Sequence, residues 1–398
     1  MAIRDWLCKQ KNAFTGKSRI YWVTAILTIV IGIIISELAA GIKVWIGIRA
    51  SVYNQLSRLS PLPHGRLRTV LALIDDEEYW RGELAGRRPL RRDYLAKIID
   101  NAIAADPSVL ALDFKLRSPS PDGNPVDHPA YRVETDKLVE AVINAAKKCP
   151  VVLPRTVHVD SGGLVTIESA VYDARQIPRK NVFEGFINLP DEVQLGRVPL
   201  AELQGRDGRK VRSFAEVIVE ANDPALPPLE RREELPFGMF LPLPEFLTVR
   251  TADVIQQEES TKAKLHHRIV IIGGHWHEDG LGGESFVDLH NSPIGLVPGT
   301  LLHANYVESL IQSRLYWEIK RSWSILFEAI AAVIVVLVFA LEVSWWLKLV
   351  GVVVAVVGLM FISLSSLFIF AVVFDFVIPV AAVVIHAVVA AVVESKQA

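Results

Sequence analysis

The sequence predicts an integral membrane protein with a mostly parallel α/β sheet flanked by helices as its extracytoplasmic domain, plus four transmembrane α-helices. Hydrophobic residues make up 51% of the 398 residues, and their longest runs lie at the two ends of the chain. The middle is rich in charged residues and proline, as in a water-exposed domain. Within it, short apolar runs alternate with amphipathic segments, which is typical of a parallel sheet covered by helices on both faces.

The first hydrophobic run, Ile20–Ala40, follows a basic leader of residues 1–19. A helix of about 20 apolar residues spans the hydrocarbon core of a bilayer, so this run predicts a first transmembrane helix. The alternative is a cleaved signal peptide, whose apolar core is about 7–15 residues long and ends at a small-x-small site. We favour the anchor, because the run is longer and continues into Gly41–Ile48 without such a site.

The C-terminal hydrophobic region contains three further runs, each long enough to cross a bilayer once. Very short linkers separate them, so we expect tight helical hairpins. Small residues such as Gly351 and Gly358 form a stripe on the middle run, which lets helices approach closely in lipid. The three predicted spans are Trp323–Val343, Leu347–Ala371 and Phe374–Val393.

The charge of the leader predicts the orientation in the membrane. Its excess of lysine and arginine places the N-terminus in the cytoplasm, because positively charged flanks stay on that side. One crossing then puts the domain Arg49–Arg321 outside, and three more return the C-terminus to the cytoplasm. We therefore expect a multi-pass protein of the bacterial cytoplasmic membrane, with a periplasmic or extracellular main domain and the lipid bilayer as its surroundings.

Apolar runs and helical patterns alternate along this domain. Buried strands and amphipathic helices follow one another, whereas residues 154–266 are expected to hold loops and weaker strands. The expected strands are Thr69–Ile74, Val109–Leu112, Val151–Leu153 and His267–Ile272, and the expected helices are Arg92–Ala104, Asp136–Lys148 and Leu301–Gln312.

Three of these strands end in distinctive residues: Asp75 and Asp76, Asp113, and the pair Gly273 and Gly274. The carboxyl ends of parallel strands line one edge of a sheet, where ligands usually bind. These positions therefore predict a cleft with acidic walls. The alternative is that the aspartates cap the following segments, as aspartate often does where a strand meets a loop.

VLALIDDEEYW, ETDKLVEAVINAAKKCPVVLP and RIVIIGG follow one another along the chain in an order that resembles the CHASE2 family of bacterial extracytoplasmic sensory domains. VLALIDDEEYW, RRPLRRDYLAKIIDNAI and VLALDF resemble its opening, and ETDKLVEAVINAAKKCPVVLP its second helix and strand. GFINLPDE and RSFAEVIVEA are similar to its middle, while RIVIIGG, the step from Asp288 to Pro293, and VPGTLLHANYVESLI resemble its closing segment. The resemblance implies a sensory domain with one membrane helix before it and three after it.

Two departures accompany the resemblance. The loop GGHWHEDGLGGESF replaces a shorter loop, and only ESKQA follows the last hydrophobic run, where the family carries an output module. We therefore expect a stand-alone form without its own output domain. The candidate ligand-binding residues are Asp75, Asp76, Arg91, Asp113, Gly273, Gly274, Asp288, His303 and Asn305.

The long loop also carries the residues best suited to a metal. His275, His277 and His290 lie among carboxylates, and imidazole with carboxylate suits zinc or another divalent transition metal. The spacing fits no metalloprotease helix. The alternative is that these histidines are exposed or hydrogen-bonded. We expect no other cofactor, and metal-dependent hydrolysis is the weakest of the functions considered.

His303 and Asn305 begin a predicted helix that leads directly to the second membrane span. One interpretation is that Asn305 or Thr300 caps this helix. The other is mechanical: the helix carries movement of the domain into Trp323–Val343. Both can hold together.

The leading hypothesis is a sensory or ligand-binding membrane protein that recognises an extracytoplasmic ligand or partner. It would signal through transmembrane contacts to another membrane protein or to copies of itself. The alternative is a structural scaffold of a membrane assembly. No P-loop or G-x-S-x-G elbow is present, and Gly273–Gly274 lacks the third glycine of a dinucleotide loop, so we expect no enzyme. The net charge of −2 argues against nucleic acid as a partner.

Overall fold

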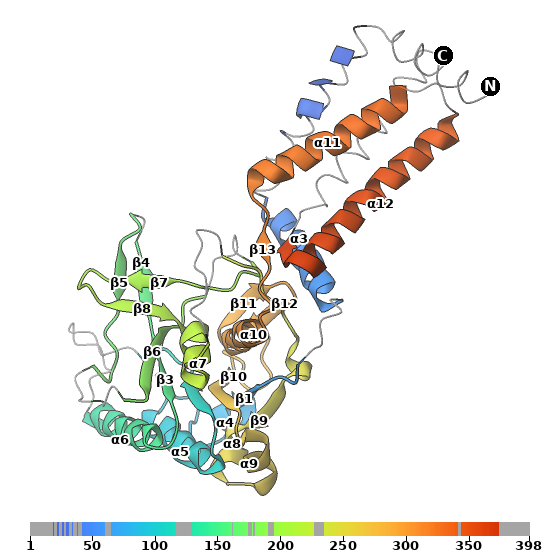
Figure 1. Cartoon of the computed structure of the whole chain (residues 1–398). Coiled ribbons are helices and arrows are strands. Elements are labelled where there is room, and N and C mark those ends of the chain that lie inside the picture. The colour runs from blue at the N-terminus through green and yellow to red at the C-terminus, as the bar shows by residue number, and fades with distance from the viewer. Residues whose placement is uncertain are drawn as a thin grey trace. The chain divides into compact units, whose positions relative to one another are not determined.

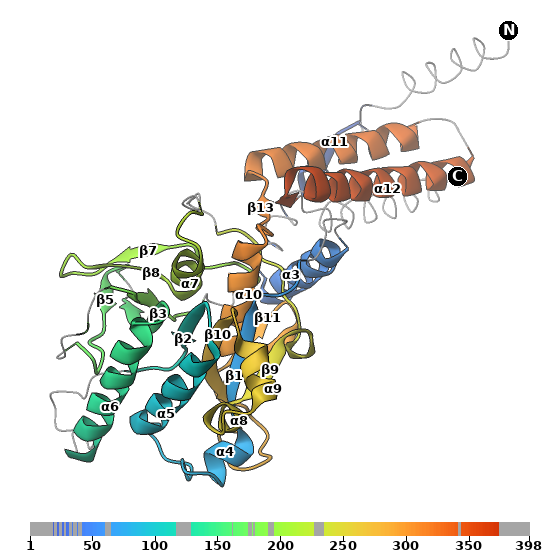
Figure 2. The same ribbon diagram turned by 60° about the horizontal axis from the view of Figure 1, so that its bottom comes forward.

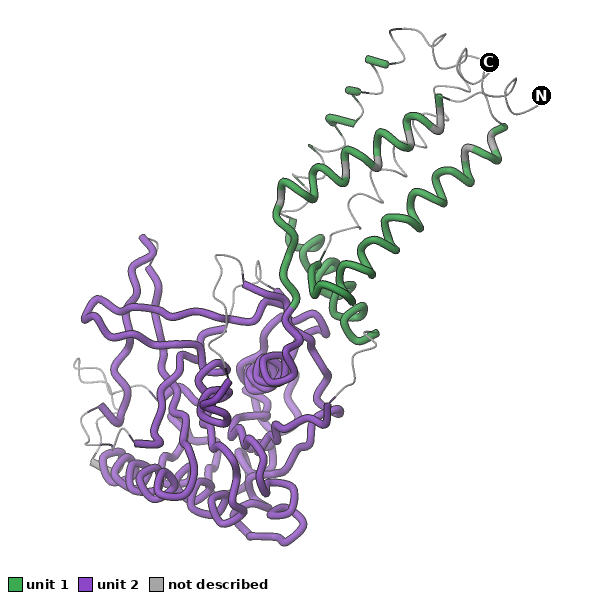
Figure 3. The backbone as a smooth tube through the Cα atoms, in the orientation of Figure 1, with its two compact units in different colours: residues 1–61, 316–398 green, residues 62–315 purple. Residues whose placement is uncertain are grey.

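The structure, a computed structural model, describes residue 19, single positions between 22 and 38, and most of the chain from 42 to 373. The described ranges are 42–59, 65–116, 129–160, 162–173, 177, 180–189, 195–226, 235–340 and 344–373. The chain forms two compact units (Figure 3). We call residues 62–315 the sheet unit, and residues 1–61 with 316–398 the helical unit.

The sheet unit is built on one eight-stranded sheet with the strand order β7-β8-β6-β3-β2-β10-β1-β9 (Figure 1). Every neighbouring pair is parallel except β7 and β8 at one edge. The predicted, mostly parallel sheet is therefore confirmed. The strands are β1 Thr69–Asp75, β2 Val109–Leu112, β3 Val151–Arg155, β6 Val182–Phe186, β7 Glu202–Gln204, β8 Lys210–Ser213, β9 Leu247–Arg250 and β10 Ile269–His275.

Helices cover both faces of this sheet (Figures 1 and 2). Along β1, Val70, Ala72 and Ile74 face one apolar core, and Leu71 and Leu73 face the other, because successive side chains of a strand point to opposite faces. The first core is closed by α5 Arg92–Ala102, α6 Pro129–Ala146, α8 Thr251–Ile255 and α9 Glu259–Leu265, and the second by α7 Phe214–Asn222 and α10 Gly299–Ile311.

The segment 154–266 differs from expectation, since its described residues include three α-helices in addition to loops and strands. The helices α8 and α9 contain five and seven residues, too few to reveal a helical period. Helix α7 buries seven of its nine residues, so it has no polar face to mark it as amphipathic. Short hairpins complete the unit: β4 Val157–Val159 with β5 Val165–Ile167, and β11 Leu289–Ser292 with β12 Gly295–Pro298.

The helical unit contains α3 Lys43–Arg58, α11 Arg321–Ala340 and α12 Trp345–Phe370, together with the short strands β13 Trp317–Glu318 and β14 Val372–Val373. Arg49 of α3 pairs with Glu318 of β13. Among the described residues, one helical stretch, Leu349–Phe370, is long and apolar enough to cross a membrane, against the four predicted. The apolar stretch of α11 over Ser322–Ile334 is shorter. The predicted span 374–393 and most of 20–40 lie outside the described residues.

Candidate functional site

A buried polar centre lies where β2 ends and α10 begins. Asp113 follows the last residue of β2, and His303 lies in the second turn of α10. His303 Nε2 is 3.6 Å from Asp113 Oδ1, and both side chains are at most 5% exposed. The hydroxyl of Thr300 donates a hydrogen bond of 2.6 Å to Asp113 Oδ2. The structure thus joins two residues that sequence analysis nominated separately.

Burial governs the charge of this pair. It raises the pKa of Asp113, against the opposing effects of His303 and of the Thr300 hydrogen bond. It also lowers the pKa of His303, against the attraction of Asp113. Removing a group from water disfavours its charged form, so burial favours the neutral form of both partners. A change that admits water to this centre would therefore favour the charged forms of Asp113 and His303.

Asp288 and His290 adjoin this centre from β11 and the loop before it. Asp288 Oδ1 is 3.0 Å from His290 Nε2, and this contact lowers the pKa of Asp288. The carbonyl of Asp288 accepts a 3.0 Å hydrogen bond from the N–H of Gly299, the first residue of α10. Gly273 lies against Thr300 so closely that a Cβ there would collide with its side chain. Five nominated residues thus converge here: Asp113, Gly273, Asp288, His290 and His303.

Helix α10 is held in place along its whole length by buried polar groups. Asn305 accepts from the N–H of Leu241 at 2.6 Å and donates to its carbonyl at 3.1 Å. Glu308 Oε1 accepts from the N–H groups of Arg68 and Thr69, at 2.7 Å each, where β1 begins. No side chain caps the helix, so the capping role predicted for Asn305 or Thr300 is wrong.

The aspartates after β1 have other partners. Asp75 accepts a 2.8 Å hydrogen bond from the N–H of Glu78, which makes it the N-cap of α4 Asp76–Trp80, and it pairs with Arg250 at 2.6 Å. Asp76 accepts a 2.7 Å hydrogen bond from the N–H of His277 and also contacts its ring. The capping interpretation therefore holds for Asp75. Asp75 and Asp76 thus have different partners from each other. Asp113 contacts none of those partners and binds Thr300 and His303 instead.

The remaining nominated residues lie around these groups. Arg91 pairs with Asp93 at 2.7 Å. A Cβ at Gly274 would meet the ring of Trp276. His275 helps to line a pocket of about 280 Å³ together with Asp75 and Arg250.

The three predicted metal ligands are held in different contacts. The rings of His275 and His277 both pack on Phe286, with centroids 4.5 and 3.9 Å away. His290 is bonded to Asp288. Within the described part of the chain, these three do not appear among the groups close enough to share an ion.

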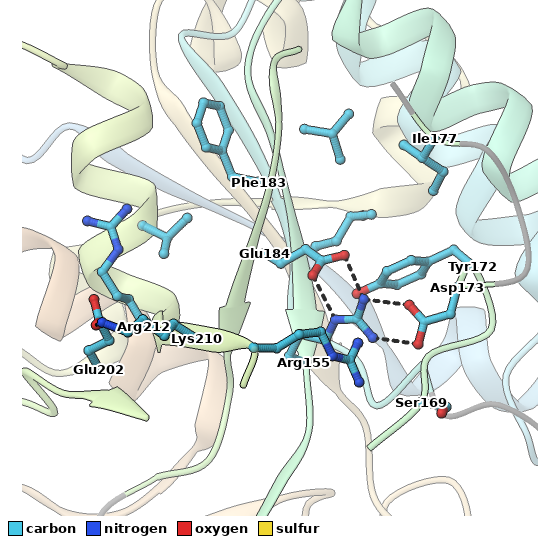
Figure 4. Close-up of a pocket in the computed structure, with 14 residues that line it drawn as sticks. Arg155, Ser169, Tyr172, Asp173, Ile177, Phe183, Glu184, Glu202, Lys210 and Arg212 are labelled. Carbon is cyan, nitrogen blue, oxygen red and sulfur yellow. Dashed lines mark hydrogen bonds and ion pairs between the residues drawn. The ribbon is translucent and has the colours of Figure 1, made fainter. Parts of the chain in front are cut away.

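A larger pocket of about 820 Å³ opens beside β3, β6 and β8 (Figure 4). At its centre, the nearly buried Arg155 binds two carboxylates. Its Nη1 is 2.8 Å from Asp173 Oδ2, and its Nε is 2.9 Å from Glu184 Oε2. The pocket is lined by Leu153, Arg155, Ser169, Tyr172, Asp173, Ile177, Val182, Phe183, Glu184, Glu202, Arg209, Lys210, Arg212 and Val217.

Charges of both signs surround this pocket. Arg155 lies between Asp173 and Glu184, and the charge of Arg209 also acts on Asp173, whereas Lys210 and Arg212 enter from β8 (Figure 4). Lys210 pairs with Glu202, and Arg212 pairs with Glu220. Sequence analysis missed this pocket. The one available signal was Arg155 at the end of an apolar run, which does not indicate its distant carboxylates.

Comparison with known proteins identifies the family of this chain. No curated protein and no solved structure matches the chain. The sequence model of the CHASE2 domain matches residues 25–341, which is most of the chain and includes the whole sheet unit. CHASE2 domains are extracytoplasmic sensory domains of membrane proteins, as the resemblance of the motifs implies. The chain therefore belongs to the CHASE2 domain family.

Proposed function

We propose that this protein is a sensor of the bacterial cytoplasmic membrane whose sheet unit binds a ligand or partner outside the cytoplasm. The response passes through α10 to transmembrane helices and then to another membrane protein or a second copy of this chain. The proposed role is binding and transmission rather than catalysis. The observation that carries the proposal is the burial and polar anchoring of α10, the last helix of the sheet unit.

The anchoring of α10 suits transmission. All residues from Gly299 to Leu310 are buried, so the helix cannot shift without breaking contacts in the core. Its polar groups bind β1, the Asp113 centre and the segment at Met239–Leu241. Packed interfaces of this kind change between discrete arrangements instead of deforming continuously. Nine residues separate the end of α10 at Ile311 from the start of α11 at Arg321.

The 820 Å³ pocket is the ligand site in this proposal. Its lining residue Val217 belongs to α7, and Arg212 lies two residues before the start of that helix. Phe214, the first residue of α7, contacts the ring of His303 edge-to-face, with centroids 5.1 Å apart. A ligand that displaces α7 therefore acts on the Asp113–His303 centre through one aromatic contact. Mixed charges around an open pocket favour a small polar ligand over an apolar one.

The membrane part of the proposal comprises four spans, Ile20–Ala40, Trp323–Val343, Leu347–Ala371 and Phe374–Val393, with both termini in the cytoplasm. Gly358 on α12 supports helix contacts with another subunit, because a Cβ added there meets nothing described within 4 Å. Small residues at open positions let a second helix approach closely in lipid.

One experiment separates sensing from scaffolding. The full-length protein is cross-linked in native membranes and purified, as wild type and as Glu184→Gln and Arg212→Gln. Glu259→Gln on the exposed surface serves as the matched control. A sensor shows altered amounts of cross-linked partner or dimer in both pocket variants and wild-type amounts in the control. Recovery of only a monomer from the wild type contradicts the proposal.

A second experiment tests the orientation. A cysteine introduced at the exposed Gly162 is treated with a membrane-impermeant maleimide in intact spheroplasts. Labelling before lysis is expected for an extracytoplasmic sheet unit. Labelling only after lysis places the unit in the cytoplasm and removes the basis for a receptor.

A structural scaffold is the second candidate function. The observation that favours it is that Asp75, Asp76 and Arg91 are already paired with Arg250, His277 and Asp93. Side chains whose charges are already paired within the protein stabilise its fold and do not need a ligand as a partner. In the cross-linking experiment, a scaffold retains the same partner in the wild type and in both pocket variants.

A further inference from the structure

Three side chains of types that bind metals lie close together at the amino-terminal edge of the sheet, away from the strand ends considered above. Asp106 follows the short helix η1 Ile103–Ala105 and precedes β2. His266 and His267 lie between α9 and β10. Strands β2 and β10 are parallel neighbours, so the loops that enter them lie side by side. The sheet thus brings together two segments separated by 160 residues.

The three side chains are close enough to share one ion. Each offers a ligand atom, and these atoms all lie within 4.8 Å of one another. His267 Nδ1 is 3.5 Å from Asp106 Oδ2, and the rings of His266 and His267 have centroids 3.8 Å apart. Around a tetrahedral zinc ion with bonds of about 2.0–2.1 Å, ligand atoms are about 3.3 Å apart. Small rotations of exposed side chains close the difference.

The backbone fixes the two loops against each other. Asp106 and His267 both have positive φ, +54° and +53°, a conformation that aspartate, asparagine and histidine adopt more readily than most residues. The N–H of His267 donates a 3.0 Å hydrogen bond to the carbonyl of Asp106. The positions of these residues are therefore set by main-chain contacts, and the side chains are left available at the surface.

One of the histidines is oriented by a hydrogen bond to a backbone carbonyl of the facing loop. His266 Nδ1 lies 3.2 Å from the carbonyl of Ala105. A carbonyl can only accept, so this contact selects the tautomer with a proton on Nδ1 and leaves Nε2 as the ligand nitrogen. Metal-binding histidines are commonly oriented by a backbone carbonyl in this way.

We propose that Asp106, His266 and His267 form a binding site for a divalent transition-metal ion, with zinc as the best fit. Two imidazoles and one carboxylate suit zinc, nickel or cobalt, whereas magnesium and calcium prefer oxygen ligands. Three protein ligands leave a coordination position open for water or an external group. The bound ion would join the loops that precede β2 and β10. This inference does not depend on the proposed sensory function.

Metal titration of the purified full-length protein tests the site. The protein is tag-free, because a polyhistidine tag would bind the same ions, and it is stripped with a chelator before Zn²⁺ or Co²⁺ is added. We expect one equivalent to bind, a cobalt absorption spectrum typical of imidazole and carboxylate ligands, and a higher melting temperature with metal. The rise in melting temperature follows because an ion that binds only the folded state stabilises it.

Three variants and one control separate this site from adventitious binding. His266→Ala, His267→Asn and Asp106→Asn each remove a ligand, and asparagine keeps the positive φ accessible at the last two positions. Each variant is expected to bind zinc at least about tenfold more weakly than the wild type. His158→Ala, which removes an exposed histidine of β4, is expected to leave the affinity unchanged.

Two results would overturn the proposal. One is that Asp106→Asn binds zinc as tightly as the wild type, because the carboxylate of Asp106 would then not be a ligand. The other is the absence of any zinc- or cobalt-dependent change in the wild type. Melting temperatures measured with chelator present identify a variant that has lost its fold. If one variant has, the zinc affinities of the other two test whether the site binds the metal.

Discussion

Glu308 provides the sharpest test of how α10 is held in the sheet unit. Its side chain is 1% exposed, and one carboxylate oxygen accepts hydrogen bonds of 2.7 Å from the N–H groups of both Arg68 and Thr69. The other oxygen accepts from the side chain of Gln312 at 2.9 Å. Replacing Glu308 with alanine therefore removes the acceptor of a fully buried N–H group, that of Thr69, and of a second that lies nearer the surface.

The expected loss follows from these two donors. A buried donor without an acceptor costs about 1–3 kcal/mol, which applies to Thr69, and the N–H of Arg68 adds less because water can reach it; the total is therefore about 3 kcal/mol. For a unit of about 150–250 residues, each kcal/mol shifts the melting temperature by about 2–4 °C, which gives a decrease of about 6–12 °C. The assay is thermal unfolding of the full-length protein in detergent, followed by circular dichroism.

Glu308→Gln is the matched control, since its amide oxygen can still accept from both N–H groups. We expect it to lose less than half of what Glu308→Ala loses. Equal losses would refute the reasoning, because the stability would then depend on the charge of Glu308 and not on the two backbone hydrogen bonds.

Three further outcomes follow from the same structure. Burial lowers the pKa of His303, so the unfolded state takes up a proton before the folded state does as the pH falls below 6.5. Acidification should therefore lower the melting temperature of the wild type more than that of His303→Gln. Equal pH profiles of the two melting temperatures would contradict this. Gly273→Ala should destabilise by about 1–3 kcal/mol through its collision with Thr300, and Thr300→Ala should relieve part of that loss in the double variant, as measured in a double-mutant cycle. Arg155→Met should lower the melting temperature most at neutral pH, and the melting temperature should recover on acidification. The reason is that protonation removes the repulsion between Asp173 and Glu184, which Arg155 neutralises in the wild type. A decrease in melting temperature that is independent of pH would exclude that cause.

The sequence by itself determined four adjacent strands of the eight-stranded sheet, namely β3, β2, β10 and β1. Strands buried on both faces read as continuous apolar runs, and β1, β2 and β10 lie within three residues of the runs that predicted them. Helix α5 was equally visible, because its buried residues repeat with the helical period. These signals are local, so a short window of sequence contains them. The family, by contrast, followed from the order of motifs along nearly the whole chain.

Only the tertiary structure decided which polar groups meet. Strand β10 is the last of the eight in the chain, yet it lies between β1 and β2, and no local pattern encodes that order. This placement brings Thr300 and His303 against Asp113 at one edge of the sheet, and His267 against Asp106 at the other. Hydrogen bonds and ion pairs depend on distances of a few ångströms between segments far apart in sequence, whereas periodicity reports only which side of an element is buried.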